Sequence, residues 1–193
     1  MSSASAESSE ARLAKLHDII RECRDCDLAL SRTRAVPGEG SPYADLVLIG
    51  EAPGASEDAA GRPFCGPAGQ LLDELLASIG IPRASVFITN TVKCRPPGNR
   101  VPTPEEAAAC ADYLKLQVAL IRPKVVATLG GPALKAVTGV AQAVSEVHGR
   151  PIRRKHFALF PLYHPAAALH KPPLRDTLFD DMRRLAEFLG SVG

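Results

Sequence analysis

Short, continuous apolar runs alternate with amphipathic stretches along most of this chain. Apolar runs of this length, bounded by polar residues or by Gly and Pro, are typical of strands buried on both faces. The predicted strands span residues 45–50, 85–90, 124–129 and 157–162. Apolar positions at helical spacing follow each strand and predict helices over residues 67–80, 104–121, 131–139 and 174–190. A further helix is predicted over residues 8–22.

Strands that alternate with helices predict the α/β class. We expect a three-layer α/β/α sandwich with a central, mostly parallel four-stranded sheet and right-handed crossovers. Thr103, Pro104 and Glu106 form a helix start signal, with Thr as the cap and Glu closing a capping box. Residues 1–8 are expected to form a flexible N-terminal tail. Since no linker or internal repeat interrupts the pattern, residues 1–193 are predicted to form a single domain.

The composition is that of an ordinary globular protein, with 46% hydrophobic and 23% charged residues. No apolar run approaches the ~20 residues of a membrane-spanning helix, and no signal-peptide pattern opens the chain. We therefore expect a cytoplasmic protein without membrane contact. The net charge of +2 is uneven, at −5 over residues 1–90 and +7 over residues 91–193. Six Lys or Arg and no acidic residue lie between Arg150 and Arg175, a stretch that either binds phosphates or forms a solvated surface.

Polar side chains stand where the predicted strands end. Glu51, Asn90 and His164 occupy or follow three strand ends, and the carboxyl ends of parallel strands meet at one edge of a sheet. Phe64 lies in a Gly- and Pro-rich segment after the first strand. Taken singly, each residue has a structural explanation, as a core ring, a turn former or a satisfied loop histidine. Their shared place at the strand ends favours a functional site.

Four of the five cysteines are candidates for one binding site. Cys23 and Cys26 make a CxxC pair, Cys94 follows a strand end, and Cys110 lies in the next predicted helix. Four thiolates bind either zinc or an iron–sulfur cluster, and the lack of a second tight pair favours a cluster. The alternatives are inert core thiols at Cys94 and Cys110, or a redox CxxC, which the lack of a preceding strand disfavours. Cys65 is predicted to be a small packed hydrophobe.

Four segments, in order along the chain, resemble the successive motifs of family 4 uracil-DNA glycosylases, which are of the iron–sulfur type. They are Gly50-Glu-Ala-Pro-Gly54, Gly61-Arg-Pro-Phe-Cys-Gly-Pro-Ala-Gly69, Thr89-Asn-Thr-Val-Lys-Cys-Arg-Pro-Pro-Gly-Asn-Arg100 and His164-Pro-Ala-Ala-Ala-Leu169. The resemblance runs from Cys23 to Leu169. It implies a monofunctional DNA repair glycosylase that flips uracil out of DNA and hydrolyses its N-glycosidic bond, leaving an abasic site in the first step of base excision repair.

The resemblance also implies three catalytic residues. Glu51 would hold or polarise a water molecule. Asn90 would read the N3/O4 edge of uracil and so discriminate it from cytosine. His164 would donate a hydrogen bond to O2, where negative charge accumulates as the base leaves.

Further residues are implied to line the pocket or to bind a cofactor. Phe64 would stack on the flipped base, and the backbone of Ala52 and Pro53 would line the pocket. Glu57 would lie near the C5 edge and exclude the thymine methyl group. The ligands of a structural [4Fe–4S] cluster would be Cys23, Cys26, Cys94 and Cys110.

Two departures from the family pattern affect the expected contacts. Cys65 stands where Val is usual, which would change the packing behind Phe64. After Leu169 the usual Arg is missing, and His170 and Lys171 follow instead. We expect Leu169 to wedge into the duplex and His170 or Lys171 to contact phosphate. The expected partner is uracil-containing DNA, single- or double-stranded, with the protein a monomer; no motif indicates a sliding clamp.

Three alternative functions would each require a different sequence. A relative that binds uracil-DNA without turnover would carry an extra basic, His-containing loop after residues 85–90, where this chain has only the segment 93–100 before the next helix cap. A non-catalytic iron–sulfur DNA-binding module would have a degraded pocket. A Rossmann enzyme would need GxGxxG after its first strand, which Gly50-Glu-Ala-Pro-Gly-Ala does not supply.

Overall fold

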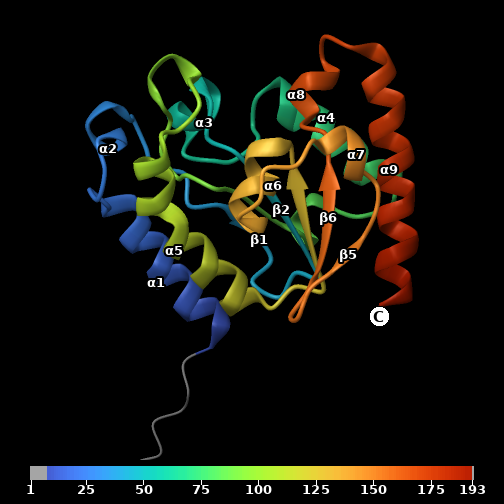
Figure 1. Cartoon of the computed structure of the whole chain (residues 1–193). Coiled ribbons are helices and arrows are strands. Elements are labelled where there is room, and N and C mark those ends of the chain that lie inside the picture. The colour runs from blue at the N-terminus through green and yellow to red at the C-terminus, as the bar shows by residue number, and fades with distance from the viewer. Residues whose placement is uncertain (1–7, 193) are drawn as a thin grey trace, which may run out of the picture.

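Four parallel strands form the centre of the sheet in the computed structural model, which describes residues 8–192 (Figure 1). Every residue of these strands is buried, which explains why they read as mainly apolar runs rather than as alternating patterns. The strands are β2 (Leu46–Gly50), β3 (Phe87–Asn90), β4 (Val125–Leu129) and β6 (Ala158–Leu162). The four predicted strands are therefore confirmed.

The sheet nevertheless has six strands, not the four that the sequence predicted, in the order β1-β3-β2-β4-β6-β5. The additional strands β1 (Glu39–Gly40) and β5 (Ile152–Arg153) pair antiparallel with β3 and β6 at the two edges. Each has two residues, too few to produce a hydrophobic pattern along the chain. The α/β class is confirmed, and the sheet is mixed at its edges.

Helices cover both faces of the sheet (Figure 1). On one face, α1, α5 and α6 pack against the sheet through an apolar cluster that includes Ile20 and Leu114. On the other face, α4 and α9 contribute Leu72 and Met182 to a second cluster. These helices are α1 (Ser9–Glu22), α4 (Pro67–Ser78), α5 (Pro104–Ile121), α6 (Gly131–Thr138) and α9 (Pro172–Ser191). Within residues 8–192, no helix combines the length and the apolar character needed to cross a lipid bilayer.

Six short helices fill the connections between these elements. Three of them, α3, α7 and α8, lie in the upper part of Figure 1, toward the carboxyl ends of the strands, whereas α2 lies at the left. The short helices are α2 (Leu28–Ser31), α3 (Ala55–Ala60), η1 (Arg83–Ser85), η2 (Pro97–Asn99), α7 (Val144–Val147) and α8 (Pro165–Ala168).

Side chains cap the starts of α1 and α5. Residues 1–7 of the predicted tail lie outside the described residues, and Ser8, its last residue, caps α1 by accepting the N–H of Ala11 at 3.2 Å. At α5 the predicted capping box is confirmed: Thr103 Oγ1 accepts the N–H of Glu106 at 3.3 Å, and the Glu106 carboxylate accepts the N–H of Thr103 at 2.8 Å. This box fixes the end of the loop that leads from β3 into α5.

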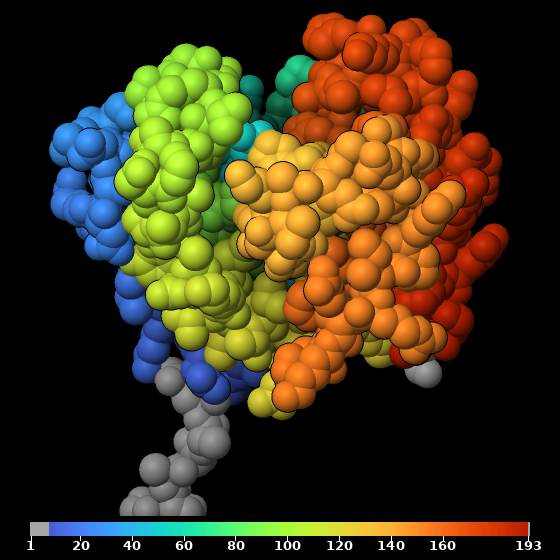
Figure 2. Space-filling view, in the orientation of Figure 1, coloured from blue at the N-terminus to red at the C-terminus, as the bar shows by residue number. Residues whose placement is uncertain are grey.

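The four central strands run in the same direction, so their carboxyl ends form one edge of the molecule. Figure 2 shows a notch at this edge, between the segment leading into α5 and the segment around α8. Residues of the loops that follow β2 lie at the back of this notch, in teal. The fold therefore places the loops with the predicted site residues around one depression.

Candidate functional site

The sheet brings the predicted catalytic residues to one edge. β2 lies beside β3, and Gly50 pairs with Asn90 in parallel register, so Glu51 follows directly beside Asn90. His164 comes two residues after β6 and lies against the end of β4, where a Cβ built on Gly130 would stand 3.3 Å from His164 Cβ. The shared position that the sequence predicted for these residues is therefore observed.

Asn90 and Glu51 carry unused hydrogen-bonding capacity. Asn90 is 2% exposed, and its Oδ1 has no hydrogen-bond partner among residues 8–192. The same is true of the buried Oε1 of Glu51, and burial raises the pKa of this carboxyl above its ordinary value. The residues that follow, Ala52 and Pro53, are half-buried and buried. Because buried polar atoms are nearly always paired, these two oxygens are available to accept hydrogen bonds from a ligand or water.

Phe64 presents a buried ring to the same site. Its ring and the imidazole of His164 stack with centroids 5.6 Å apart and an interplanar angle of 29°. Its backbone is left-handed, with φ of 49°, which is uncommon for a residue other than glycine. The ring closely approaches Gly50, where an added Cβ would lie 2.7 Å from Phe64 Cζ and 2.4 Å from Asn90 Oδ1. The absence of a side chain at Gly50 is thus what lets Phe64 and Asn90 come together.

The imidazole of His164 is held in a defined protonation state. Its Nδ1 accepts the backbone N–H of Ala166 at 3.1 Å, at the start of α8. Burial lowers the pKa of His164 to about 4, although the negative charge of Glu57 acts in the opposite direction. At neutral pH the ring is therefore uncharged, with its proton on Nε2, which makes Nε2 a hydrogen-bond donor.

Glu57 contacts backbone rather than open space. Its Oε2 accepts the N–H of Gly54 at 3.1 Å, and its Oε1 accepts the N–H groups of Cys65 and Gly66 at 3.0 and 3.1 Å. Glu57 therefore joins the loop after β2 to the loop that carries Phe64. Its predicted contact with the C5 edge of uracil stays a prediction.

The four predicted ligand cysteines line one cavity, between the end of α1, the CxxC loop and the start of α5. Burial raises the pKa of Cys94, and it raises that of Cys110 to about 11. Arg32 donates from Nη1 to Cys94 Sγ at 2.9 Å. The cavity wall includes Cys23, Cys26, Cys94 and Cys110, with Arg32, Lys93 and Tyr113. Within the described part of the chain, no group of three or more His, Cys, Asp or Glu side chains is arranged to hold a metal ion.

Cys65 does not pack as predicted. The sequence suggested a small buried hydrophobe behind Phe64, but Cys65 is exposed while its neighbours Pro63 and Phe64 are buried. The left-handed backbone at Phe64 turns the ring inward and leaves the next side chain on the surface. This prediction was wrong because the sequence alone does not reveal that the backbone at Phe64 turns into the left-handed region.

Lys93 is a buried residue whose role the sequence did not reveal. Its ammonium donates to Thr89 Oγ1, the carbonyl oxygen of Asn90 and Gln117 Oε1, each at 2.7 Å. Burial lowers its pKa to about 7. Lys93 therefore fixes the backbone at Asn90 and stands beside the cysteine cavity. A lysine is normally exposed, so the sequence gives little reason to expect burial of Lys93. Its position directly before Cys94 is the one signal that places it near the cysteine cavity.

The predicted DNA-contact residues directly follow α8, and the segment around α8 borders the notch. Leu169 is 42% exposed, and His170 and Lys171 are exposed in the same turn between α8 and α9. The basic stretch 150–175 does not form a single surface. Arg154 and its neighbours in the turn between β5 and β6 lie at the opposite end of the sheet, at the bottom of Figure 1. Only part of this stretch is near the site.

Comparisons with known proteins place this chain among its relatives. Residues 37–186 match the family model described as the uracil DNA glycosylase superfamily. The chain is 44% identical to a type-4 uracil-DNA glycosylase of Archaeoglobus fulgidus, covering 92% of this chain and 95% of that protein. It is 45% identical to one of Pyrobaculum aerophilum, covering 92% and 93%. It is 42% identical to one of Thermotoga maritima, covering 90% and 93%.

Proposed function

This chain belongs to the uracil-DNA glycosylase superfamily and, as a member, excises uracil from DNA; we propose that the strand-end site described above carries out this reaction. The observation that supports this assignment is the pair of unpartnered buried oxygens on Asn90 and Glu51, beside a buried ring and an uncharged imidazole donor. Recognition of a base edge, stacking on a base, and stabilisation of a leaving anion are the tasks that a base-flipping glycosylase must perform.

Recognition depends on Asn90 and Phe64. The Oδ1 of Asn90 accepts the N3–H of uracil, and the amide N–H₂ donates to O4. Cytosine has an acceptor at N3 and a donor at its exocyclic nitrogen, so the same amide meets it with unmatched groups. Phe64 stacks on the flipped base. Ala52 and Pro53 line the pocket through their backbones, and Glu57 lies near the C5 edge.

The bond that breaks joins N1 of uracil to C1′ of deoxyribose, and the electron pair leaves with the base. His164 donates from Nε2 to O2 and stabilises the resulting negative charge without transferring its proton. Glu51 accepts a hydrogen bond from the attacking water, whose oxygen forms the new bond to C1′. The proton released from this water neutralises the uracil anion through solvent, leaving an abasic site and free uracil.

We expect the purified protein to release uracil from a labelled oligonucleotide that contains one uracil, so that alkali then cuts the strand at the abasic site. Matched oligonucleotides with cytosine or thymine at that position should stay intact, because the pocket matches neither base. Single- and double-stranded forms are compared in the same assay. An uncut strand in a band that survives denaturant would indicate a covalent trap, and an uncut, unshifted strand would contradict the proposal.

Four cysteines around one cavity support a [4Fe–4S] cluster as the cofactor. In such a cluster each thiolate binds a different iron, so the thiols lie farther apart than four ligands of a single zinc ion. All four cysteines line one cavity, and the lack of a second tight cysteine pair in the sequence favours a cluster over zinc. Cys23, Cys26, Cys94 and Cys110 would hold the cluster, and Arg32 and Lys93 would offset its negative charge. The cluster would stabilise the fold around Asn90.

Cys94→Ser is expected to lose most of the bound iron and sulfide, whereas Cys65→Ser retains both. The reason is that Cys94 is buried in the cavity and Cys65 is exposed elsewhere. Iron and acid-labile sulfide are measured on protein purified without oxygen, with thermal denaturation alongside. Equal iron in the two variants, or zinc in place of iron in the wild type, would contradict the cluster.

The remaining assignments belong to the same proposal. Leu169 wedges into the space that the flipped base leaves, and His170 or Lys171 contacts phosphate, since all three are exposed directly after α8. The chain acts as one domain and as a monomer in the cytoplasm. The family match over residues 37–186 supports a single glycosylase domain.

A further inference from the structure

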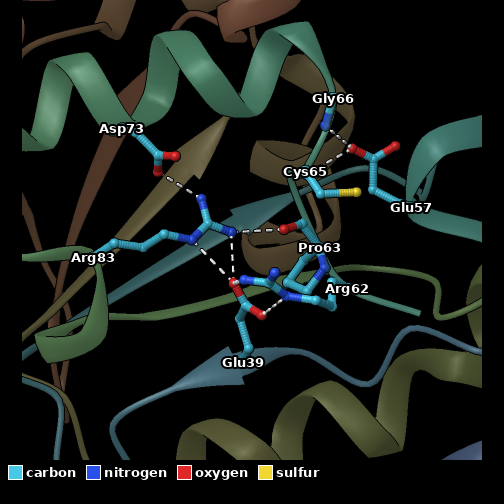
Figure 3. Close-up of polar contacts among 8 residues, drawn as sticks. All are labelled: Glu39, Glu57, Arg62, Pro63, Cys65, Gly66, Asp73 and Arg83. Atoms are coloured by element: carbon cyan, nitrogen blue, oxygen red, sulfur yellow. Dashed lines mark hydrogen bonds and ion pairs between the residues drawn. The ribbon is translucent and has the colours of Figure 1, made fainter. Parts of the chain in front are cut away.

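The conformation of Phe64 must be imposed by its surroundings. A left-handed backbone at a residue with a large side chain is strained and persists only where neighbouring contacts hold it. One such contact is with Gly69 in α4, where an added Cβ would lie 1.8 Å from the carbonyl oxygen of Phe64. Two charged side chains bind the backbone on either side of Phe64 (Figure 3).

Arg83 binds the backbone before Phe64. Its Nη2 donates to the carbonyl oxygen of Pro63 at 2.7 Å. The same guanidinium donates to Glu39 from Nε and Nη2, at 3.0 and 2.8 Å, and to Asp73 from Nη1 at 2.7 Å. Arg83 follows α4 in the chain and is half-buried, so it reaches the Phe64 loop from a separate part of the fold.

Glu39 holds this guanidinium in place. It lies in the edge strand β1 and accepts hydrogen bonds from Arg62 Nε at 2.8 Å as well as from Arg83. Burial acts to raise the pKa of Glu39, but the hydrogen bonds from the two arginines lower it below its ordinary value. Glu39 therefore stays ionised, and its two arginine partners lie on the segment before Phe64 and on η1.

Glu57 binds the backbone after Phe64. Its Oε1 accepts the N–H groups of Cys65 and Gly66, and its Oε2 accepts the N–H of Gly54 in the loop that begins with Glu51. Hydrogen bonds from backbone N–H groups to a carboxylate are stronger than neutral ones. The strained residue is therefore held from both sides by ionised side chains.

We propose that Arg83, set by Glu39, and Glu57 are positioning residues that hold the Phe64 ring ready to stack on the flipped base. The role of Phe64 rests on the proposed function, whereas the restraint of its loop does not. Exposed ion pairs generally contribute little, and Arg62 is largely exposed. The decisive contacts are therefore those of Arg83 and Glu57 with the backbone of residues 63, 65 and 66.

The restraint is tested first without DNA, by hydrogen exchange of peptides that cover residues 62–70. We expect Arg83→Ala to speed exchange at Cys65 and Gly66 by about tenfold, because the loop opens more often. The matched control is Asp73→Ala, which removes a partner of Arg83 on the side away from Pro63 and should leave these amides unchanged. A peptide over α6 reports any global loss of structure. Unchanged exchange in Arg83→Ala would overturn the restraint.

The link to catalysis is tested by a double-mutant cycle with Phe64→Leu. We expect Arg83→Ala to lower kcat/KM for uracil-DNA by about tenfold in the wild-type background, because a small misplacement of the ring is costly. In the Phe64→Leu background, Arg83→Ala should lower kcat/KM by about twofold at most, since the ring through which Arg83 acts is gone. Glu57→Gln is run as a second variant in the hydrogen-exchange measurement and not in this cycle, because the proposed place of Glu57 near the C5 edge of uracil would lower kcat/KM independently of Phe64.

Equal losses in the two backgrounds would overturn the positioning role. A wild type that leaves uracil-DNA intact, or a Phe64→Leu variant of full activity, would instead reject the proposed function. In that case the hydrogen-exchange result still decides whether Arg83 and Glu57 restrain the loop, so the two failures are distinguishable.

Discussion

His164→Ala is expected to slow the release of uracil by about 10²–10³-fold, the loss typical of removing one preorganised donor to a developing oxyanion. The affinity for uracil-DNA should change much less, because contacts with the DNA backbone are made by other residues. Single-turnover measurements at saturating enzyme separate the two effects. His156→Ala is the matched control, since this histidine is exposed in the turn before β6, at the opposite end of the sheet.

The pH dependence gives a second test of His164. Because burial lowers the pKa of His164 to about 4, the ring is neutral from about pH 5 to pH 8 and does not change its charge near 6.5, the ordinary value for histidine. The plot of rate against pH should therefore have the same shape near pH 6.5 in the wild type and in His164→Ala, with no inflection that is specific to the wild type. Such an inflection, or an equal loss in His156→Ala, would contradict the neutral-donor role.

The central sheet could be predicted because its strands are buried on both faces. β2, β3, β4 and β6 appear in the sequence as short, mainly apolar runs, and each is followed by helical spacing. The edge strands β1 and β5 were missed because their identity depends on pairing with β3 and β6, and two residues carry no pattern of their own. The spacing of apolar residues within a segment does not show which distant segment it pairs with.

The residues of the site likewise fall into those that the sequence could predict and those that it could not. Glu51, Asn90 and His164 could be predicted because the topology of a parallel sheet carries strand ends to one edge. Arg83, Glu39 and Lys93 were missed because their roles depend on tertiary contacts with residues far along the chain, as in the bond from Arg83 to the carbonyl oxygen of Pro63. Burial of Lys93 among three acceptors was equally invisible, since a lysine in a sequence is expected at the surface.

Gly50→Ala is expected to lower kcat/KM for uracil-DNA by about 10²-fold, although it adds a single methyl group. The new Cβ would stand 2.4 Å from Asn90 Oδ1 and 2.7 Å from Phe64 Cζ, well inside van der Waals contact. Both side chains must move, and a displacement of about 1 Å in a recognition group costs roughly two orders of magnitude. Overpacking should also lower the free energy of unfolding, by about 1–3 kcal/mol.

Thermal denaturation shows whether Gly50→Ala remains folded, and product inhibition by free uracil reports the pocket itself. Inhibition should weaken in step with the loss of activity, because Asn90 and Phe64 bind the base in both cases. Gly131→Ala is the matched control: it lies beside the end of β4, and its nearest neighbour would be Val144 Cγ2 at an ordinary 3.8 Å. Its activity should stay within about twofold of wild type, since no side chain has to move. If Gly50→Ala stays folded with full activity, uracil does not bind between Asn90 and Phe64, and the pocket must be sought elsewhere along the strand ends.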